Sequence, residues 1–533
     1  MENFGCRATQ ADGAAVERQF EERGLARASS PSQASVVVMN TCTVTAAADQ
    51  DARAAIRRVQ RQNPDAQIVV TGCYAQRAPE EIAALPGVSL VIGNSHKHQL
   101  AQIVAAKGSA RVCEAESLSI VESRSVSGTV SDCGWPSASP DFGWSSAFSA
   151  AKSPTALDGA LAPEARAFVP LADLTENRAL RTENSIFVSD IFAHTELLAA
   201  PVFDAANERT RPNLKVQDGC DNRCSFCVIP YVRGQSRSLE MNQIIREVNA
   251  LVDSGYREVV ISGINLGRWG RDLVVRSQRS TVSNSDHRLE TLIHAILAET
   301  PLEKLRISSV EPMDWSDELI SLVASSPRIA KHTHVPMQSG SDAVLRRMHR
   351  KYRPWHYREK IEKIRAAMPT AAIGADVMLG FPGETGAEFE STRRMIEDLP
   401  FTYLHVFTYS ARPGTPAASM ANQVPVHVAR ERNRVLRELA AEKKLAFMRG
   451  FIGKTVEAIT LNVVGTDGGG EFTEALTDNY LKLRLRGRHE GNQWIGARVE
   501  GVLDGALVGD LSEADALSES CQPSLPCTYI KPQ

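Results

Sequence analysis

The sequence has no apolar run near the roughly 20 residues that a membrane-spanning helix needs. It also has no large excess of one charge, because 60 basic and 63 acidic residues leave a net charge of −3. Its first residues show no basic segment followed by an apolar stretch, so no signal peptide is expected. These absences predict a cytoplasmic protein without membrane contact, in which any nucleic-acid contact comes from local basic patches.

Residues 1–112 alternate strands with helices, the first part of a chain of 533 residues that is too long for one core. Ser35–Met39, Gln67–Val70 and Leu90–Ile92 are short apolar runs typical of buried parallel strands. Ala46–Gln62 has the pattern of a helix between the first two. This order predicts a small doubly wound α/β sheet.

Residues 211–447 return to the same alternation. The expected strands are Leu214–Gln217, Glu258–Ile261, Lys304–Ile307, His334–Pro336, Ile373–Leu379 and Tyr403–Phe407. Helices are expected between them, among them Met241–Ser254, Ser316–Ala324 and Glu388–Asp398. Six strand–helix units of this kind predict a partial parallel (βα)6 barrel.

The remaining segments differ in composition. Residues 113–210 are predicted to be a low-complexity insert or linker, because 117–156 are rich in Ser, Ala, Gly and Pro. Ile186–Phe192 could form a strand there, and the polar stretch 274–287 resembles a surface insertion. Residues 448–511 are expected to form a small β-barrel, and 512–533 a tail. The strands of that barrel are predicted at Thr455–Leu461, at Phe472–Arg486, as one strand or as two, and at Ala497–Val508.

Three of the ten cysteines stand together as Cys220-x3-Cys224-x2-Cys227. They follow an expected barrel strand, and active sites of such barrels lie at the carboxyl ends of the strands. Three thiolates can hold three irons of a cubane cluster, and no fourth cysteine is near, so one iron stays open. The alternative is a zinc knuckle, which would need a fourth Cys or His at short spacing. The motif therefore favours a catalytic iron–sulfur site.

A second set of cysteines is spread over the first region. Cys6, Cys42 and Cys73 are each separated by about one βαβ unit, roughly 30 residues. Cys42 and Cys73 follow neighbouring expected strands, and ligands of open α/β sheets bind at that edge. These three could converge on a second cluster, although single cysteines after strands are more often small buried residues.

Both cysteine patterns lie in sequence stretches that resemble the radical S-adenosylmethionine (SAM) methylthiotransferase family. The matching stretches include NTCTVT, VVTGCYAQRAPEEI, KVQDGCDNRCSFCVIPYVRGQSRS, HVPMQSGSDAVLRRMHRKY and DVMLGFPGET. NTCTVT and LTDNYLKLRL are most similar to the branch that acts on N6-threonylcarbamoyladenosine, the transfer RNA (tRNA) adenosine just 3′ of the anticodon.

The resemblance implies an architecture and a set of roles. It implies an α/β protein with an N-terminal cluster domain, a radical SAM barrel and a C-terminal RNA-binding β-barrel called TRAM. Cys220, Cys224 and Cys227 would be the catalytic residues that hold a [4Fe-4S] cluster, and a second such cluster would sit on Cys6, Cys42 and Cys73. The residues near bound SAM would be Phe226, Ser262, Gly263, Gly380, Pro382 and Gly383. For each glycine a plain tight turn is an equal alternative.

A basic stripe falls in the last expected barrel. In LKLRLRGR the cations alternate with leucines, so they share one face of a strand while the leucines face the core. Phosphate contact is one interpretation of this face, and an ordinary solvated surface is the other. The stripe consists of Lys482, Arg484, Arg486 and Arg488.

The activity implied by the resemblance is methylthiolation of C2 of the modified adenosine in the tRNA anticodon loop. A low-potential electron donor and a sulfur donor would be further partners. Sister branches act on isopentenyladenosine or on a ribosomal-protein aspartate, and a non-catalytic alternative is an iron–sulfur carrier or storage protein. Two departures stand out: only five residues precede Cys6, which predicts a shortened first strand or an upstream start codon, and the 113–210 insert has no counterpart. Four cysteines match no family position: Cys113, Cys133, Cys521 and Cys527.

Overall fold

The computed structural model describes residues 1–107, 185–194, 197, 211–276 and 287–512. One compact unit comprises residues 1–101 and 184–533, and a second comprises 102–183, most of which lies outside the described residues. Most of the 113–210 insert, most of the 274–287 insertion, nearly all of the 512–533 tail and the four unmatched cysteines also fall outside them.

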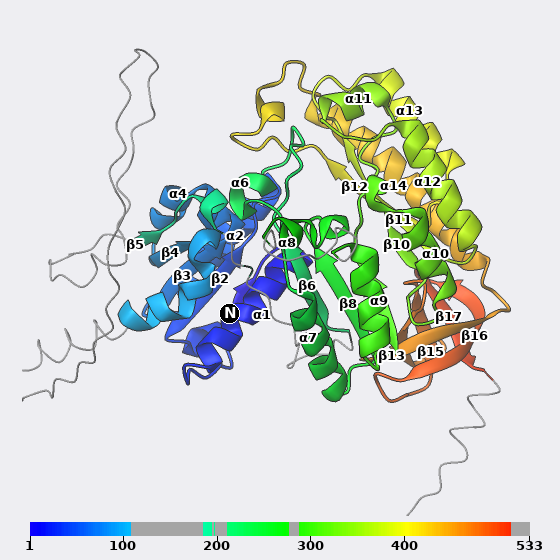
Figure 1. The fold of residues 1–533 in the computed structure, drawn as a ribbon, viewed down its shortest axis with the longest axis horizontal. Helices are drawn as coiled ribbons and strands as arrows, with labels where there is room; N and C mark the ends of the chain where they lie inside the picture. Colours follow the sequence, from blue (N-terminus) through cyan, green and yellow to red (C-terminus); the bar gives the residue numbers. More distant parts are fainter. Residues whose placement is uncertain (108–184, 195–196, 198–210, 277–286, 513–533) are drawn as a thin grey trace, which may run out of the picture. The chain divides into compact units, whose positions relative to one another are not determined.

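The N-terminal residues form a parallel five-stranded sheet (Figure 1). Its strands lie in sequence order: β1 (Glu2–Asn3), β2 (Val36–Thr41), β3 (Gln67–Gly72), β4 (Val88–Gly93) and β5 (Ser185–Phe187). The helices here are α1 (Arg7–Glu21), α2 (Ala46–Gln62), α3 (Cys73–Arg77) and α4 (Pro79–Ala83).

Helices cover both faces of this sheet. Met39 packs in one apolar cluster with Ile56 of α2, whereas the next residue, Asn40, donates from the opposite face to the Thr9 carbonyl of α1. The strand order contains no reversal, so the expectation of a doubly wound sheet is wrong in this respect. The two-residue β1 pairs only at the outer edge of β2, whereas a reversal would place it between β2 and β3.

Six parallel strands form the central domain, in two sheets. One sheet has the order β7-β6-β8-β9, with β7 antiparallel, and the other has β10-β11-β12. The strands are β6 (Asn213–Asp218), β7 (Arg237–Ser238), β8 (Glu258–Gly263), β9 (Lys304–Ile307), β10 (His332–His334), β11 (Ala372–Leu379) and β12 (Tyr403–Thr408). Strand β10 ends at His334, the residue at which the expected strand His334–Pro336 begins. Pro336 has no N–H to donate to a ladder.

Helices follow these strands as expected. They are α6 (Ile229–Arg233), α7 (Met241–Asp253), α8 (Arg271–Arg276), α9 (Leu289–Glu299), α10 (Asp317–Ser325), α11 (Asp342–Arg347), α12 (Pro354–Ala367), α13 (Gly386–Asp398) and α14 (Val426–Arg449). Alternate strand residues such as Leu214, Val216 and Ile261 pack with Val248 and Ile293 of the helices in one large core. The opposite face of these strands carries buried polar side chains such as Lys215, Gln217 and Ser262. A polar site can therefore form on that face.

The C-terminal strands close into a barrel of order β13-β14-β15-β17-β16. The strands are β13 (Thr455–Asp467), β14 (Gly470–Thr477), β15 (Lys482–Arg486), β16 (Trp494–Leu503) and β17 (Ala506–Leu511). Two expected long strands are each broken by a turn, one at Tyr480 (φ 71°) and one at Asp504–Gly505 (φ 48° and 74°). Leu483 and Leu485 fill the barrel core together with Met448 of α14.

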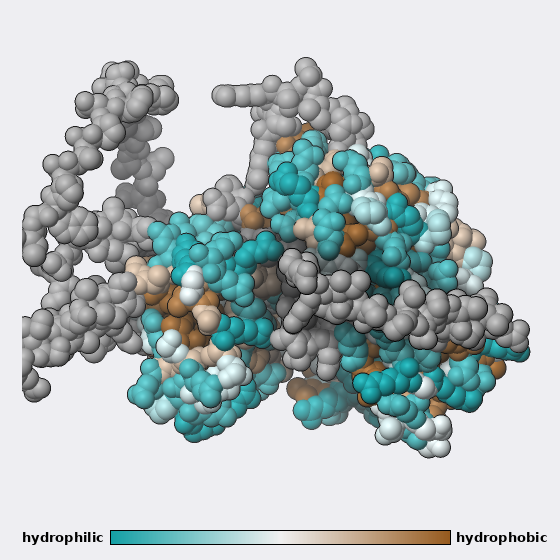
Figure 2. Space-filling model, turned by 90° about the horizontal axis from the view of Figure 1, so that it is seen from below, coloured by the Kyte–Doolittle hydropathy of each residue, from teal (hydrophilic) through white to brown (hydrophobic). Residues whose placement is uncertain are grey.

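Hydrophilic residues cover much of the described surface seen in Figure 2, with apolar residues in scattered patches. No helix among the described residues is both long enough and apolar enough to cross a bilayer.

Candidate functional site

The cysteines of the CxxxCxxC motif lie on the loop that follows β6. The backbone N–H of Cys220 donates to Gly234 O at 3.1 Å, and that of Cys227 donates to Cys224 O at 3.1 Å. Gly219, which precedes them, has φ +70°, and a Cβ there would stand 1.9 Å from Gln235 O. The loop therefore requires glycine at this position, directly before the first of the three cysteines.

Two side chains from other segments reach these thiols. Asn265, after β8, lies with Nδ2 3.7 Å from Cys220 Sγ, and Arg350, after α11, lies with Nη1 3.3 Å from Cys224 Sγ. Arg350 is also ion-paired with Glu311. Burial, followed by the neighbouring Cys224 thiolate, raises the pKa of Cys227 to about 12. Buried thiols of this kind keep their protons until a bound cation replaces them.

The structure brings Cys6, Cys42 and Cys73 to the carboxyl edge of the N-terminal sheet. Cys42 and Cys73 directly follow β2 and β3, and Cys6 precedes α1. A Cβ on Gly5 would stand 2.8 Å from Cys42 Sγ, so the Cys6 loop lies against Cys42. Burial first, and then the thiolates of Cys73 and Cys6, raise the pKa of Cys42 to about 11. None of these thiols is in a disulfide.

The two cysteine sets adjoin each other. Cys73 is buried in an apolar cluster with Val228 and Val232, and Val228 directly follows Cys227 in the chain. Asn94, which follows β4, donates one amide group to both Cys73 Sγ (3.6 Å) and Val232 O (2.7 Å). Helix α3, which begins at Cys73, and helix α6, which follows the CxxxCxxC motif, are therefore packed together.

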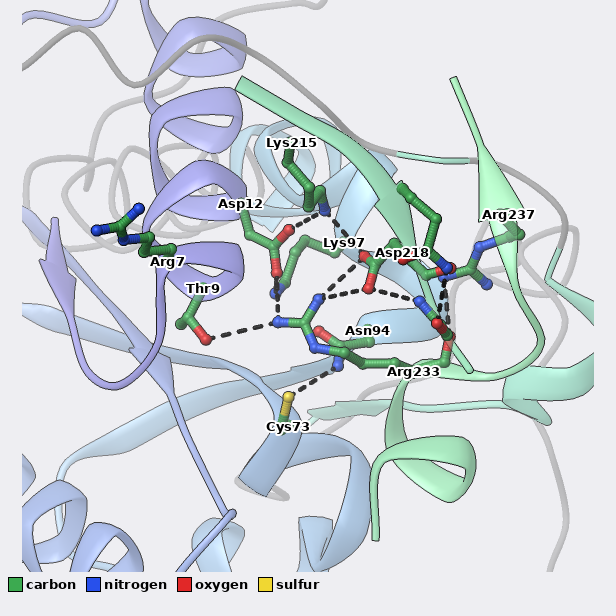
Figure 3. Close-up of polar contacts among 12 residues, drawn as sticks. Arg7, Thr9, Asp12, Cys73, Asn94, Lys97, Lys215, Asp218, Arg233 and Arg237 are labelled. Carbon is green, nitrogen blue, oxygen red and sulfur yellow. Dashed lines mark hydrogen bonds and ion pairs between the residues drawn. The ribbon is translucent and has the colours of Figure 1, made fainter. Parts of the chain in front are cut away.

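Buried charges lie beside this junction (Figure 3). Arg233 of α6 donates to Asp218 at 2.9 Å and to Asp12 of α1 at 2.9 Å. Lys97 pairs with Asp12 at 3.0 Å, and Lys215 pairs with both carboxylates. The guanidinium of Arg233, between its two carboxylates, has a pKa well above its usual value despite its burial.

Comparisons with known proteins identify the family of this chain. Residues 1–93 match uncharacterized protein family UPF0004, and residues 214–396 match the radical SAM superfamily. The threonylcarbamoyladenosine tRNA methylthiotransferase MtaB of Bacillus subtilis (strain 168) is 32% identical over 91% of this chain and 90% of its own. The chain belongs to the radical SAM tRNA methylthiotransferase family. It is thus an enzyme, and its family implies SAM and a [4Fe-4S] cluster.

Other relatives of this methylthiotransferase carry two different names. The Aquifex aeolicus MtaB is 31% identical, covering 92% of this chain and 97% of that protein. A tRNA-2-methylthio-N(6)-dimethylallyladenosine synthase of Novosphingobium aromaticivorans is 30% identical, covering 93% and 88%. Among solved structures, the radical SAM methyltransferase TsrM of Kitasatospora setae is 14% identical, with a TM-score of 0.45 and coverage of 78% and 74%.

Of the residues expected near SAM, Phe226 lies in the CxxxCxxC loop, and Gly380 and Pro382 lie beside it through Phe381. The ring of Phe226 meets that of Phe381 edge-on at 6.5 Å, between Gly380 and Pro382. Ser262 is buried at the end of β8, and its Oγ has no partner among the described residues. The buried Oδ1 of Asn265 is likewise without a partner in the described part of the chain. Such orphaned polar atoms suit a polar ligand.

The glycines expected near SAM have local structural reasons of their own. Gly380 and Gly383 have φ +71° and +76°, and a Cβ on Gly380 would stand 2.7 Å from Ala429 Cβ of α14. A Cβ on Gly263 would stand 2.8 Å from Gln217 Oε1. The turn and the close packing require glycine at these positions whether or not a cofactor touches them.

Three cations of the basic stripe alternate as expected, but the expectation for Arg488 is wrong, because β15 ends at Arg486 and the chain turns at Gly487 (φ 80°). The stripe also carries acidic partners. Leu483 and Leu485 are buried, and the cations between and beside them face outward. Arg484 lies 3.2 Å from Asp504, and Arg486 lies 2.6 Å from Glu500. Lys482 lies 3.7 Å from Glu474, whereas Arg488 is exposed and no ion pair holds it within the described chain.

Sequence patterns did not single out the buried ion network. Its members are scattered in the sequence from Asp12 to Arg233, so no short motif indicates that they form a network. The available signal was Lys215, a cation inside an otherwise apolar strand pattern. A second missed cluster joins Asp376 to His334 (3.3 Å) and His405 (3.2 Å) across β10–β12, and the histidines keep the pKa of Asp376 low in spite of its burial.

Proposed function

We propose that this enzyme methylthiolates C2 of N6-threonylcarbamoyladenosine beside the tRNA anticodon. The observation that carries the proposal is the packing of Cys73 against Val228, which brings two sets of three thiols into adjoining loops. A single-cluster radical enzyme has no need for the second set, whereas a sulfur-inserting enzyme needs a place for sulfur beside the place where its radical forms.

The radical site is assigned to Cys220, Cys224 and Cys227. These thiolates would bind three irons of a [4Fe-4S] cluster and leave the fourth open for SAM. Asn265 and Arg350 would orient the thiolates through their contacts with Cys220 and Cys224. The orphaned Ser262 Oγ would receive a polar group of SAM.

The second site is assigned to Cys6, Cys42 and Cys73. Three free thiols and nearby buried cations are a donor set that suits an anionic iron–sulfur cluster. When bound, SAM and the two clusters supply the radical and sulfur-transfer chemistry. The chain's own tasks are to hold the clusters side by side, to exclude water through residues such as Val228 and Val232, and to admit the base. A low-potential electron donor and a sulfur donor are the further partners we expect.

The RNA contact is assigned to the C-terminal barrel as a TRAM-like module. Exposed ion pairs such as those of Arg486 are worth little, so phosphates could replace their carboxylates. Arg488 is already available, and Lys482, Arg484 and Arg486 continue the stripe. A base in a single-stranded loop can splay out to reach a buried site, which suits the anticodon loop of a cytoplasmic tRNA.

One observation favours the threonylcarbamoyl substrate over the dimethylallyl one. His334, Asp376 and His405 lie together on the neighbouring strands β10, β11 and β12. Polar groups of this kind match a substituent with a carboxylate and a hydroxyl better than a hydrocarbon.

The test uses anaerobically reconstituted enzyme with SAM, a reductant and sulfide. Three anticodon stem-loops are offered, which carry threonylcarbamoyladenosine, isopentenyladenosine or plain adenosine, and nucleosides are identified by mass spectrometry. We expect the 2-methylthio product from the first alone. Product from the second alone would assign the sister activity, and SAM cleavage without any methylthio nucleoside would refute the proposal.

A further inference from the structure

Five charged side chains are buried together where α1 meets β6. All are at most 6% exposed: Asp12, Lys97, Lys215, Asp218 and Arg233. Burying a charge is expensive unless partners compensate it, so such a cluster needs a reason beyond stability. Arg237 is also buried and donates to Arg233 O at 2.8 Å, so four cations stand against two carboxylates and positive charge is in excess.

The excess charge lies against the second cysteine set. Arg233 Nη2 lies 3.5 Å from Thr9 Oγ1, and this hydroxyl is 3.6 Å from Cys6 Sγ. Asn94, which contacts Cys73 Sγ, belongs to the same short helix as Lys97 (Asn94–Gln99). Figure 3 shows Arg233 between Asp12 and Asp218, with Cys73 and Asn94 beside it.

The same residues span both halves of the site. Asp12 belongs to the helix that begins after Cys6, and Asp218 lies two positions before Cys220. Arg233 ends the helix that begins after Cys227. One guanidinium thus fixes the segment around the first cysteine set relative to the segment around the second.

We propose that Arg233, held by Asp12 and Asp218, is the positioning residue and counter-charge of an iron–sulfur cluster on Cys6, Cys42 and Cys73. A cubane with a dipositive core and three thiolates is a monoanion, which the excess positive charge would stabilise. The cation favours reduction of this cluster, because reduction adds negative charge beside it. This inference rests on the proposed function only in placing a cluster there.

The test measures the second cluster alone, in full-length chain carrying Cys220→Ala, Cys224→Ala and Cys227→Ala. Iron content and a potential titration followed by electron paramagnetic resonance are recorded for Arg233→Gln, Arg233→Lys and Asp12→Asn. The matched control is Arg306→Gln, which removes another fully buried guanidinium and breaks its pair with Glu258, the first residue of β8.

The expected shifts have opposite signs. Arg233→Gln lowers the reduced fraction at a fixed potential about tenfold, a shift of about 59 mV for one electron. Asp12→Asn shifts it the other way, while Arg233→Lys and Arg306→Gln stay near the parent. If Arg233→Gln does not fold, the test compares the reduced fraction of Asp12→Asn with that of Arg233→Lys.

Shifts of the same sign in Arg233→Gln and Asp12→Asn, or none in either, would overturn the inference, since they denote loosening of the fold or no influence. If the triple cysteine variant binds about four irons but Arg233→Gln and Asp12→Asn do not shift its reduction potential, the inference about Arg233 alone is refuted. A parent that binds no iron refutes the second cluster itself, and with it both proposals.

Discussion

Cys73 and Val228 share one apolar cluster, although they follow strands of different sheets, β3 and β6, and lie far apart in the sequence. Val228 is the direct neighbour of Cys227, so this contact sets the approach of the two cysteine loops. Close packing in protein interiors leaves little room to absorb a larger side chain there.

Enlarging Val228 should therefore uncouple the two half-reactions. In Val228→Phe we expect SAM cleavage within about twofold of the parent but methylthio product reduced about a hundredfold, because a displacement near 1 Å can cost that much. Deoxyadenosine and product are measured in the same reaction. Val228→Ile is the control and should keep both activities, and an equal loss of both in Val228→Phe would show that the contact is merely structural.

Ser262 offers a test of SAM binding that stability does not confound. Its buried Oγ has no partner in the described structure, so Ser262→Ala should leave thermal unfolding of the apoprotein unchanged. SAM affinity should fall about tenfold, through loss of one hydrogen bond in a buried site. Ser316→Ala is the contrast: it removes the cap of α10, costs about 1 kcal/mol of unfolding free energy and spares SAM binding. Unchanged SAM affinity in Ser262→Ala would remove this residue from the site.

The raised pKa of Cys42 makes the apoprotein sensitive to alkali. The folded pKa, about 11, exceeds the usual thiol pKa of 9.0, so the folded chain keeps its proton when the unfolded chain loses it. Stability is full below pH 9 and falls as the pH rises toward 11, by about 1 kcal/mol at pH 10. Denaturant unfolding of apoprotein at pH 8 and pH 10 should show this loss in the parent and less of it in Cys42→Ala. Equal losses in both would place the titration elsewhere.

The C-terminal barrel should affect tRNA affinity without affecting radical formation. Arg488→Ala is expected to weaken tRNA binding a few-fold and to lower the slope of log affinity against log salt by about 1. Arg434→Ala, on the exposed face of α14, removes a cation of similar exposure and should do neither. If the two variants behave alike, the basic stripe is an ordinary solvated surface.

Strands and helices with clear periodicity were predictable from the sequence. The helix Ala46–Gln62 was placed correctly at both ends, since Thr45 caps its start by accepting from Ala48 N. The convergence of Cys42 and Cys73 followed from the rule that parallel strands end at one edge. The turn at Tyr480 was harder, because a non-glycine residue with positive φ leaves no mark in the apolar pattern.

What the sequence could not predict depends on contacts between distant segments. The pairing of β1 at the edge of β2 rests on two residues, which carry no periodic signal. The ion network joins Asp12 to Arg233, and each of these is locally an ordinary surface-type residue. The acids that face Arg484 and Arg486 come from β13, β16, β17 and a turn, so the neutralised stripe emerged only from the closed barrel.

The proposed function requires this chain to hold two iron–sulfur clusters side by side. Iron and sulfide are counted after anaerobic reconstitution of the parent and of the Cys42→Ala/Cys73→Ala double variant. We expect about eight irons per parent chain and about four in the double variant, which keeps Cys220, Cys224 and Cys227. About four irons in both proteins would exclude the second cluster, because only the radical cluster would then assemble.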